Sequence, residues 1–220
     1  MIKIYNPTKR PIDKSIINII DQYQRDLNLI ICHGGDGTLI GADRIYPDTP
    51  KLAIRSSHIC AKCYSPDNLS AILESIKLGH INPYQYIRLQ ASFNHQKLVA
   101  LNDINIKCIH PNLALRFSYV INDVSFTNII ADGLIVSTPF GSSAYFKSIT
   151  RTIFHQGIGV AVINPTEPIL NQVVADDSVV SITIDREKAI ICSDNNPKIY
   201  TLKPGDTVTI KKYSKPALIY

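Results

Sequence analysis

The stretch Gly34-Gly35-Asp36-Gly37-Thr38 decides the fold, and only His33 separates it from the short apolar run Leu29 to Cys32. An apolar run of this length that ends at a glycine turn is typical of a buried strand in a parallel sheet. Glycines in the turn let the backbone approach a bulky anion and present its N–H groups, and the helix expected over residues 39–45 adds a positive N-terminal end. The sequence therefore predicts a strand, a turn and a helix that together bind the phosphate groups of a nucleotide.

The residues on either side extend this unit into an alternation of short strands and amphipathic helices, which favours a helix-covered parallel sheet. We expect strands at 3–5 and 52–54, a helix over 13–26, and a second helix that opens at Ser65-Pro66 and ends at Gly79. The first 81 residues are therefore predicted to form an α/β domain of the Rossmann-like kind, with a parallel sheet.

From about residue 82 the pattern changes to β-branched and period-two runs with a single helix candidate. The runs span residues 84–93, 98–109, 113–121, 129–137, 158–163, 179–185 and 207–213. Residues 82–220 are therefore predicted to form a β-rich, sandwich-like domain, and the last residues are candidates to return to the first domain.

The bulk composition excludes some classes of protein and leaves others open. With 220 residues and 45% hydrophobic composition, the chain is long and apolar enough to bury a core, so disorder is not expected. The net charge of +5 is spread along the chain and suits small anionic ligands as well as nucleic acid. Neither an apolar run of membrane-spanning length nor a signal-peptide pattern is present, and we expect a cytoplasmic protein.

The five cysteines are odd in number and lack the dense spacing of a disulfide framework, which fits a reducing compartment and structural roles. One pair, Cys60-Ala-Lys-Cys63, follows His58 and has the spacing of zinc ligands. A second ligand pair at a plausible distance is missing from the sequence, so the prediction favours structural cysteines over a zinc site.

Asp36 is the residue of the glycine turn that most needs an explanation. A carboxylate inside an anion-binding loop is electrostatically costly unless it holds a metal ion or receives a proton. The loop lacks the Lys-Ser/Thr ending of a P-loop and the Gly-x-Gly-x-x-Gly spacing of dinucleotide folds. A tight turn with Asp36 bonded to its own backbone is the simpler interpretation of the motif alone. The cost of the charge nevertheless favours a functional carboxylate.

Two other stretches carry polar residues where a strand or turn would not require them. Residues 131–145 run through a strand, Asp132-Gly133-Leu134-Ile135-Val136-Ser137, into the turn Thr138-Pro139-Phe140-Gly141, and then into Ser142-Ser143-Ala144-Tyr145. The two serines are candidates to cap a following helix, and the tyrosine offers a flat ring and a hydroxyl. Leu101-Asn102-Asp103 interrupts an apolar strand and, taken alone, fits a bulge or a turn.

In this order the three stretches resemble the NAD kinase family. The first matches the family's Gly-Gly-Asp-Gly-Thr motif, residues 131–145 are similar to its glycine-rich block, and Asn102-Asp103 lies where the family has Asn-Glu inside a strand. Weaker similarity covers nearly the whole chain, in Ala53-Ile54 with His58, in Ser193-Asp194-Asn195 and in Pro204-Gly205-Asp206. Diacylglycerol and sphingosine kinases and, loosely, phosphofructokinases share the first motif, so the resemblance depends on the order and coverage of all three.

The resemblance implies transfer of a phosphoryl group from ATP, or from polyphosphate, to the 2′-hydroxyl of the adenosine ribose of NAD. Asp36 would be the general base, and Mg²⁺ or another divalent cation would offset the developing charge. Asn102 and Asp103 would hold the adenosine, with Asp132 and Ser148 toward the nicotinamide end. The other residues expected at the site are Gly34, Gly35, Gly37, Thr38, His58, Phe140, Gly141, Ser143, Ala144, Tyr145 and Asp194. The family also implies a homodimer or homotetramer, without a nucleic-acid or membrane partner.

The sequence departs from the family pattern at three places. Asp103 replaces a Glu that is one methylene longer, and Phe140 replaces a Thr or Ser whose hydroxyl faces adenine, so its ring either stacks on a base or blocks it. Ser57 and Cys60 replace glycines of the segment that contains His58. Two other functions therefore stay open, a lipid kinase of the diacylglycerol or sphingosine type and a non-catalytic NAD(P)-binding regulator. The lack of a membrane-facing apolar helix counts against the first, and the intact Asp36 counts against the second.

Overall fold

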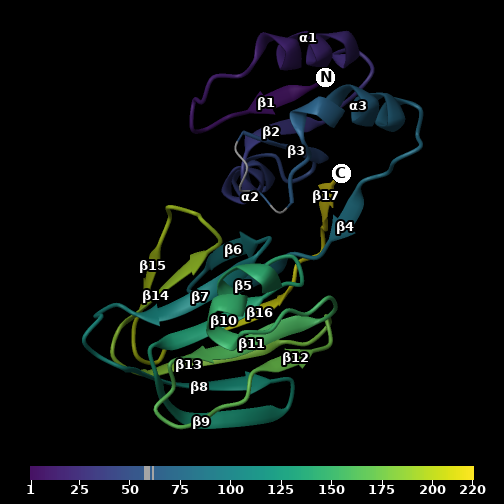
Figure 1. Cartoon of the computed structure of the whole chain (residues 1–220). Helices are drawn as coiled ribbons and strands as arrows, with labels where there is room; N and C mark the ends of the chain where they lie inside the picture. The colour runs from purple at the N-terminus through teal and green to yellow at the C-terminus, as the bar shows by residue number, and fades with distance from the viewer. Residues whose placement is uncertain (57–59, 61) are drawn as a thin grey trace. The chain divides into compact units, whose positions relative to one another are not determined.

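The computed structural model describes residues 1–56, 60 and 62–220 and divides into two compact units (Figure 1). The first unit holds Met1–Tyr86 together with Ala217–Tyr220, and the second holds Ile87–Pro216. The sequence places the boundary at residue 82, whereas strand β4 (Tyr84–Tyr86) belongs to the first unit because it pairs with the C-terminal strand β17 (Ala217–Ile219). The end of the chain is thus part of the sheet of the first unit.

The first unit is built on a five-stranded sheet in the order β1-β2-β3-β17-β4, parallel except for the pair β17 and β4. The elements not yet named are β1 (Lys3–Tyr5), β2 (Ile30–Gly34), β3 (Lys51–Arg55), α1 (Lys14–Tyr23), α2 (Asp36–Ile45), the 3-10 turn η1 (Pro66–Asn68) and α3 (Leu69–Lys77). The α/β fold with a parallel sheet, predicted from the sequence, is confirmed.

Local chemistry sets the ends of these helices. The side chain of Asp13 caps α1 by accepting a hydrogen bond from the backbone N–H of Ser15 at 2.8 Å, and Pro66 opens the turn before α3. Helix α1 stops at Tyr23, earlier than the sequence predicts, because the N–H groups of Asp26 and Leu27 both turn back to the Tyr23 carbonyl. Apolar residues of α1 and α3 share one buried core with the sheet.

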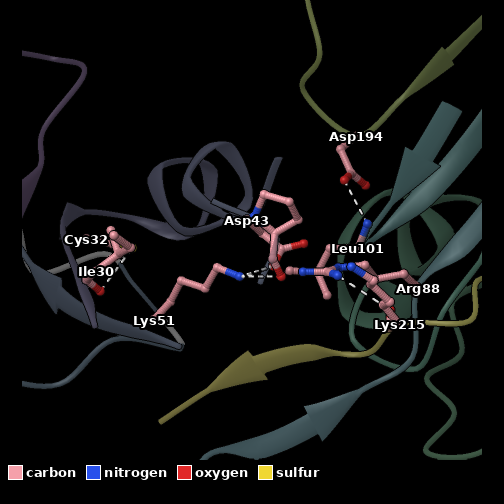
Figure 2. Close-up of polar contacts among 9 residues, drawn as sticks. Ile30, Cys32, Asp43, Lys51, Arg88, Leu101, Asp194 and Lys215 are labelled. Atoms are coloured by element: carbon pink, nitrogen blue, oxygen red, sulfur yellow. Dashed lines mark hydrogen bonds and ion pairs between the residues drawn. The ribbon is translucent and has the colours of Figure 1, made fainter. Parts of the chain in front are cut away.

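A buried ion pair joins α2 to the neighbouring strand. The ammonium nitrogen Nζ of Lys51 in β3 lies 2.6 Å from Oδ1 of Asp43 in α2, and the Lys51 side chain is fully buried (Figure 2). Breaking such a pair leaves an uncompensated buried charge, which typically costs about 3–5 kcal/mol. The last turn of α2 is therefore fixed to the sheet, while its first residue belongs to the glycine turn.

The second unit is a sandwich of two six-stranded antiparallel sheets, ordered β12-β11-β10-β7-β14-β15 and β6-β5-β16-β13-β8-β9. The strands of the first sheet are β12 (Gln172–Val174), β11 (Ile158–Ile163), β10 (Gly133–Ser137), β7 (Asp103–Cys108), β14 (Ala189–Ser193) and β15 (Tyr200–Leu202). Those of the second are β6 (Gln96–Ala100), β5 (Leu89–Phe93), β16 (Thr207–Lys212), β13 (Val180–Arg186), β8 (Leu115–Ile121) and β9 (Val124–Ala131). Alternate residues of both sheets fill one apolar core, as in a β-sandwich. The predicted β-rich class is confirmed.

Several expected elements begin or end elsewhere. The run 98–109 is broken at Leu101-Asn102 into β6 and β7, so these residues lie in a turn and not within a strand as the sequence predicts. The run 129–137 is likewise broken at Asp132 into β9 and β10, which belong to different sheets. The helix expected from residue 39 begins at Asp36. The strands β12, β14 and β15 are short and were not expected.

After the Pro139-Phe140-Gly141 turn, the chain forms the π-helical turn η2 (Ser142–Phe146) and the short helix α4 (Lys147–Thr150). Neither Ser142 nor Ser143 caps α4, so that prediction is wrong; the hydroxyl of Ser142 instead donates to the carbonyls of Pro139 and Phe154, at 2.8 and 2.9 Å. Within the described ranges, each helix is too short or too polar to cross a lipid bilayer.

Candidate active site

The glycine turn of the first unit places Asp36 at the start of α2. The carbonyl of Gly35 accepts from the N–H of Thr38 at 2.9 Å and from that of Leu39 at 3.2 Å, which closes the first helical turn. A Cβ at Gly34 would lie 2.1 Å from Oγ1 of Thr38, so this position requires glycine. Gly37 is exposed and Asp36 is half-buried. The Asp36 carboxylate therefore lies at the positive N-terminal end of α2. The helix end can bind a phosphate group, and the carboxylate can accept a proton at the same place.

Two cysteines and a lysine surround Asp36. The Sγ atom of Cys60 lies 3.1 Å from Oδ1 of Asp36, and Cys60 is joined to Cys63 by a disulfide. Burial lowers the pKa of Lys62, and the nearby carboxylate of Asp36 opposes that effect. This disulfide was not predicted from the sequence; the Cys-x-x-Cys turn allows it by bringing the two Cα atoms to 5.6 Å. His58, expected at the site, lies outside the described residues.

In the second unit a single carboxylate holds the turn that contains Asn102. The two carboxylate oxygens of Asp194 accept hydrogen bonds from the backbone N–H groups of Leu101, Asn102 and Asp103, at 2.8, 2.8 and 3.0 Å. Figure 2 shows the first of these bonds. The N–H of Asp194 donates in return to the Asp103 carbonyl at 2.9 Å. We call this arrangement, residues 101–103 with Asp194, the Asp194 clamp.

The Thr138-Pro139-Phe140-Gly141 turn packs directly on this clamp. The backbone N–H of Thr138 donates to the Asn102 carbonyl at 2.8 Å, and the N–H of Gly141 donates to the Thr138 hydroxyl at 3.1 Å. A Cβ at Gly141 would lie 2.3 Å from the Asn102 carbonyl oxygen, closer than any side chain is tolerated. Two of the three stretches that the sequence singled out are therefore brought together by the fold of the second unit.

The side chains of Asn102 and Asp103 are both buried. Within the described part of the chain, Oδ1 of Asn102 has no hydrogen-bond partner, and such an acceptor is costly unless something binds it. Burial raises the pKa of Asp103 to about 7, and the Asp194 carboxylate adds to this shift; the amide of Asn105, which donates to Asp103, and the charge of Lys107 oppose it. Asp103 therefore titrates near neutral pH.

The remaining expected residues lie just before strand β10 or in the segment that follows it. Asp132, just before β10, is exposed and accepts from the Asn164 amide at 2.8 Å. The ammonium group of Lys107 lies 4.3 Å from the centroid of the half-buried Tyr145 ring, and the Ser148 hydroxyl donates to the Tyr145 carbonyl at 2.7 Å. Ser143 and Ala144 are exposed, whereas Phe140 is buried.

The register of β7 and β10 shows how these groups are spaced. Ser137 of β10 is paired with Asp103, and Gly133 is paired with Lys107. Four residue steps at roughly 3.3 Å each separate the two ends by about 13 Å. The clamp thus lies at one end of β10 and Asp132 at the other.

Asn105 and Lys107 were not predicted as site residues. Together with Asp103 they occupy alternate positions of β7, so the three polar side chains share one face of the strand, while Ile104 and Ile106 fill the core. The alternation of polar and apolar residues over 103–107 is the sequence pattern from which this polar face could have been predicted.

A glycine turn with a carboxylate on an α/β unit, and a clamped polar turn on a β-sandwich, define a two-unit nucleotide-dependent phosphotransferase. Residues 101–220 match the family model described as the ATP-NAD kinase C-terminal domain. The chain belongs to the NAD kinase family.

Curated relatives agree with this assignment. The chain is 32% identical over 210 residues to the NAD kinase of Pseudomonas fluorescens strain SBW25, covering 88% of this chain and 70% of the relative. It is 28% identical over 204 residues to the NAD kinase of Chlorobium limicola, and 25% identical over 201 residues to that of Methanosarcina acetivorans. Each match covers 88% of this chain, and they cover 71% and 73% of the two relatives.

Solved structures share the fold. A crystal structure of yeast NADH kinase in complex with NADH has a TM-score of 0.80 at 19% identity, covering 88% of this chain and 61% of the yeast chain. An NAD kinase from Archaeoglobus fulgidus in complex with ATP has a TM-score of 0.80 at 18% identity, covering 100% of this chain and 92% of the archaeal chain.

Proposed function

We propose that this chain is an NAD kinase, which transfers the γ-phosphoryl group of ATP to the 2′-hydroxyl of the adenosine ribose of NAD and releases NADP. The observation that carries the proposal is the intact Gly-Gly-Asp-Gly-Thr turn with Asp36 at the first position of α2. Family membership supports the same activity, and the two structural neighbours were crystallised with NADH and with ATP. These features favour a kinase over a lipid-directed enzyme or a non-catalytic regulator.

Asp36 is proposed to be the general base. The ribose hydroxyl must lose its proton as its oxygen attacks the γ-phosphorus in line, and a positioned carboxylate can accept that proton. The N-terminal end of α2 and the backbone around Gly34 and Gly35 would stabilise the negative charge on the phosphate oxygens. The divalent cation, Mg²⁺ in this proposal, enters with the triphosphate, whose phosphate oxygens are the hard ligands that Mg²⁺ prefers.

The second unit is proposed to hold NAD along strand β10. The open acceptor Oδ1 of Asn102 and the buried Asp103 would bind the adenosine, and Asp132 with Ser148 would lie at the nicotinamide end. The spacing of about 13 Å between the ends of β10, taken from the strand rise, suits an extended dinucleotide. The half-buried ring of Tyr145, next to Lys107, offers an aromatic face to the dinucleotide, and Gly141 allows the close approach of the two turns.

The activity is tested by incubating the purified chain with NAD, ATP and Mg²⁺ and measuring NADP. Removal of a general base typically lowers the rate by about 10²- to 10⁴-fold, and this loss is expected for Asp36→Asn. Asp21→Asn, which changes an exposed carboxylate on α1, is the matched control and should keep full activity. NADP formation that persists in Asp36→Asn would remove the base assignment. Absence of NADP with wild type, alongside retained NAD binding, would favour the regulator.

The same assay separates donors and acceptors when polyphosphate replaces ATP or NADH replaces NAD. The proposal also includes a homodimer or homotetramer, supported by the position of strand β9 at the edge of its sheet, since an edge strand can pair with a strand of another chain. Light scattering coupled to gel filtration measures the oligomer directly. The cytoplasmic location expected from the sequence stays a prediction.

A further inference from the structure

Asp36 belongs to a second cluster that phosphoryl transfer does not require. One ligand atom each from Asp36, Cys60 and Cys63 lies within 4.8 Å of the other two, and all three residues are half-buried. The Cys60 Sγ is 3.1 Å from Oδ1 of Asp36, and the Cys63 Sγ is 3.7 Å from the Gly34 carbonyl oxygen. The Cys-x-x-Cys pair, which lacked a further ligand in the sequence, thus gains a third one from the fold.

We propose that Asp36 and the reduced Cys60 and Cys63 form a binding site for one borderline-soft divalent cation of the zinc type. Cys-x-x-Cys supplies two thiolates at the spacing that zinc sites use, and a carboxylate oxygen is an accepted third ligand. Three protein ligands leave the fourth tetrahedral position to water, as in open zinc sites. The site rests on geometry alone and does not depend on the proposed kinase activity.

The disulfide makes this site conditional on reduction. A thiol reductant must transfer two electrons and two protons to the S–S bond, which yields two thiols while the reductant becomes a disulfide. Binding of the cation then displaces the two thiol protons, since thiolates are the metal ligands. With the disulfide formed, Cys60 and Cys63 offer no thiolate, so this site binds the cation only in the reduced chain.

Occupation of the site would take Asp36 away from catalysis, a consequence that does rest on the proposed function. A carboxylate that ligates a cation cannot accept the proton of the ribose hydroxyl. Mg²⁺ prefers oxygen ligands and competes poorly for thiolates, so excess Mg²⁺ should not relieve the inhibition. A base held beside a thiol pair would make the enzyme sensitive to zinc-type cations and to oxidation state.

The test is Co²⁺ and Zn²⁺ binding by the full chain, reduced with dithiothreitol and freed of it by gel filtration under nitrogen. Co²⁺ should give thiolate charge-transfer and tetrahedral absorption bands at one ion per chain, and Zn²⁺ should displace it. The oxidised chain should bind neither ion. A reduced wild type without these bands, or with a zinc Kd weaker than about 10 µM, overturns the proposal, and this arm needs no variant.

Variants locate the ligands. Cys60→Ser and Cys63→Ser should each lose the thiolate bands, and Asp36→Asn should weaken Zn²⁺ binding by about tenfold or more. Cys108→Ser, which changes a free cysteine of the second unit, should bind as wild type does. Unchanged binding in Cys60→Ser overturns the site. NADP formation by a chain that binds no cation refutes only this inference, whereas cation binding by a chain that makes no NADP when free of that cation refutes only the proposed function.

Discussion

The two motif-bearing turns of this molecule are held in different ways. The Gly34-Gly35-Asp36 turn is closed by two backbone bonds to the Gly35 carbonyl and leaves its carboxylate half-buried. The clamp of the second unit is fixed by three N–H groups on one carboxylate, and a glycine packs against its backbone. On the proposed function, this difference corresponds to a division of labour, in which the second unit is shaped in advance for recognition and the first presents a base and a helix end for chemistry.

Among the substitutions that test this difference between the two turns, Asp194→Ala should have the largest effect. The substitution removes the acceptor of three backbone N–H groups, and we expect a loss of about 3 kcal/mol in the free energy of unfolding, together with a rise in the KM for NAD of about tenfold. Urea denaturation and steady-state kinetics measure the two effects. Asp185→Ala is the control, because Asp185 is exposed and accepts from the Ser118 hydroxyl at 2.6 Å. Equal stability of the two variants would contradict the role of the clamp.

Gly141→Ala should have the next largest effect. Its Cβ would meet the Asn102 carbonyl, a backbone atom that cannot rotate away, so overpacking should cost about 1–3 kcal/mol and raise the KM for NAD. Gly205→Ala, which meets no atom within 4 Å and changes only a backbone preference, should leave the KM unchanged. If both variants bind NAD as wild type does, the contact between the two turns does not shape the site.

A smaller effect should appear in the pH dependence of stability. The pKa of Asp103 is raised from 3.8 to about 7 in the folded chain, so the folded state holds a proton that the unfolded state has released. Stability contributed by this group is complete below pH 4 and falls as the pH rises toward 7. Asp103→Asn removes that loss, and its stability relative to wild type should be higher at pH 8 than at pH 5 in urea denaturation. The same difference at both pH values would refute the buried, protonated form.

Much of this fold is encoded in local patterns. The strand over residues 158–163 and the helix beginning after Asp13 follow from apolar runs and a capping residue, and the Gly34 to Thr38 turn was recognisable from its glycines. Pairings between distant segments were not recognisable. Asp194 meets residues 101–103 only because β14 pairs with β7, and the sequence offers no local signal for that contact.

Two other features were hard to predict for the same reason. Asn102-Asp103 taken alone fits a bulge or a turn, but the apolar residues on both sides of it favour one continuous run over residues 98–109, so the split into two strands was only partly recognisable. The Cys60 Sγ atom lies 3.1 Å from Oδ1 of Asp36, which is 24 positions earlier in the sequence, and no local pattern indicates that contact. Site composition was thus partly predictable, and site geometry was not.

The division of labour between the units is tested most directly by the affinity of Asp36→Asn for NAD, measured by isothermal titration calorimetry. The account predicts a Kd within about threefold of wild type, while NADP formation falls by about 10²- to 10⁴-fold, because a general base contributes to the rate and not to uniform binding. Loss of NAD binding in parallel with turnover, or turnover that survives the substitution, would contradict it.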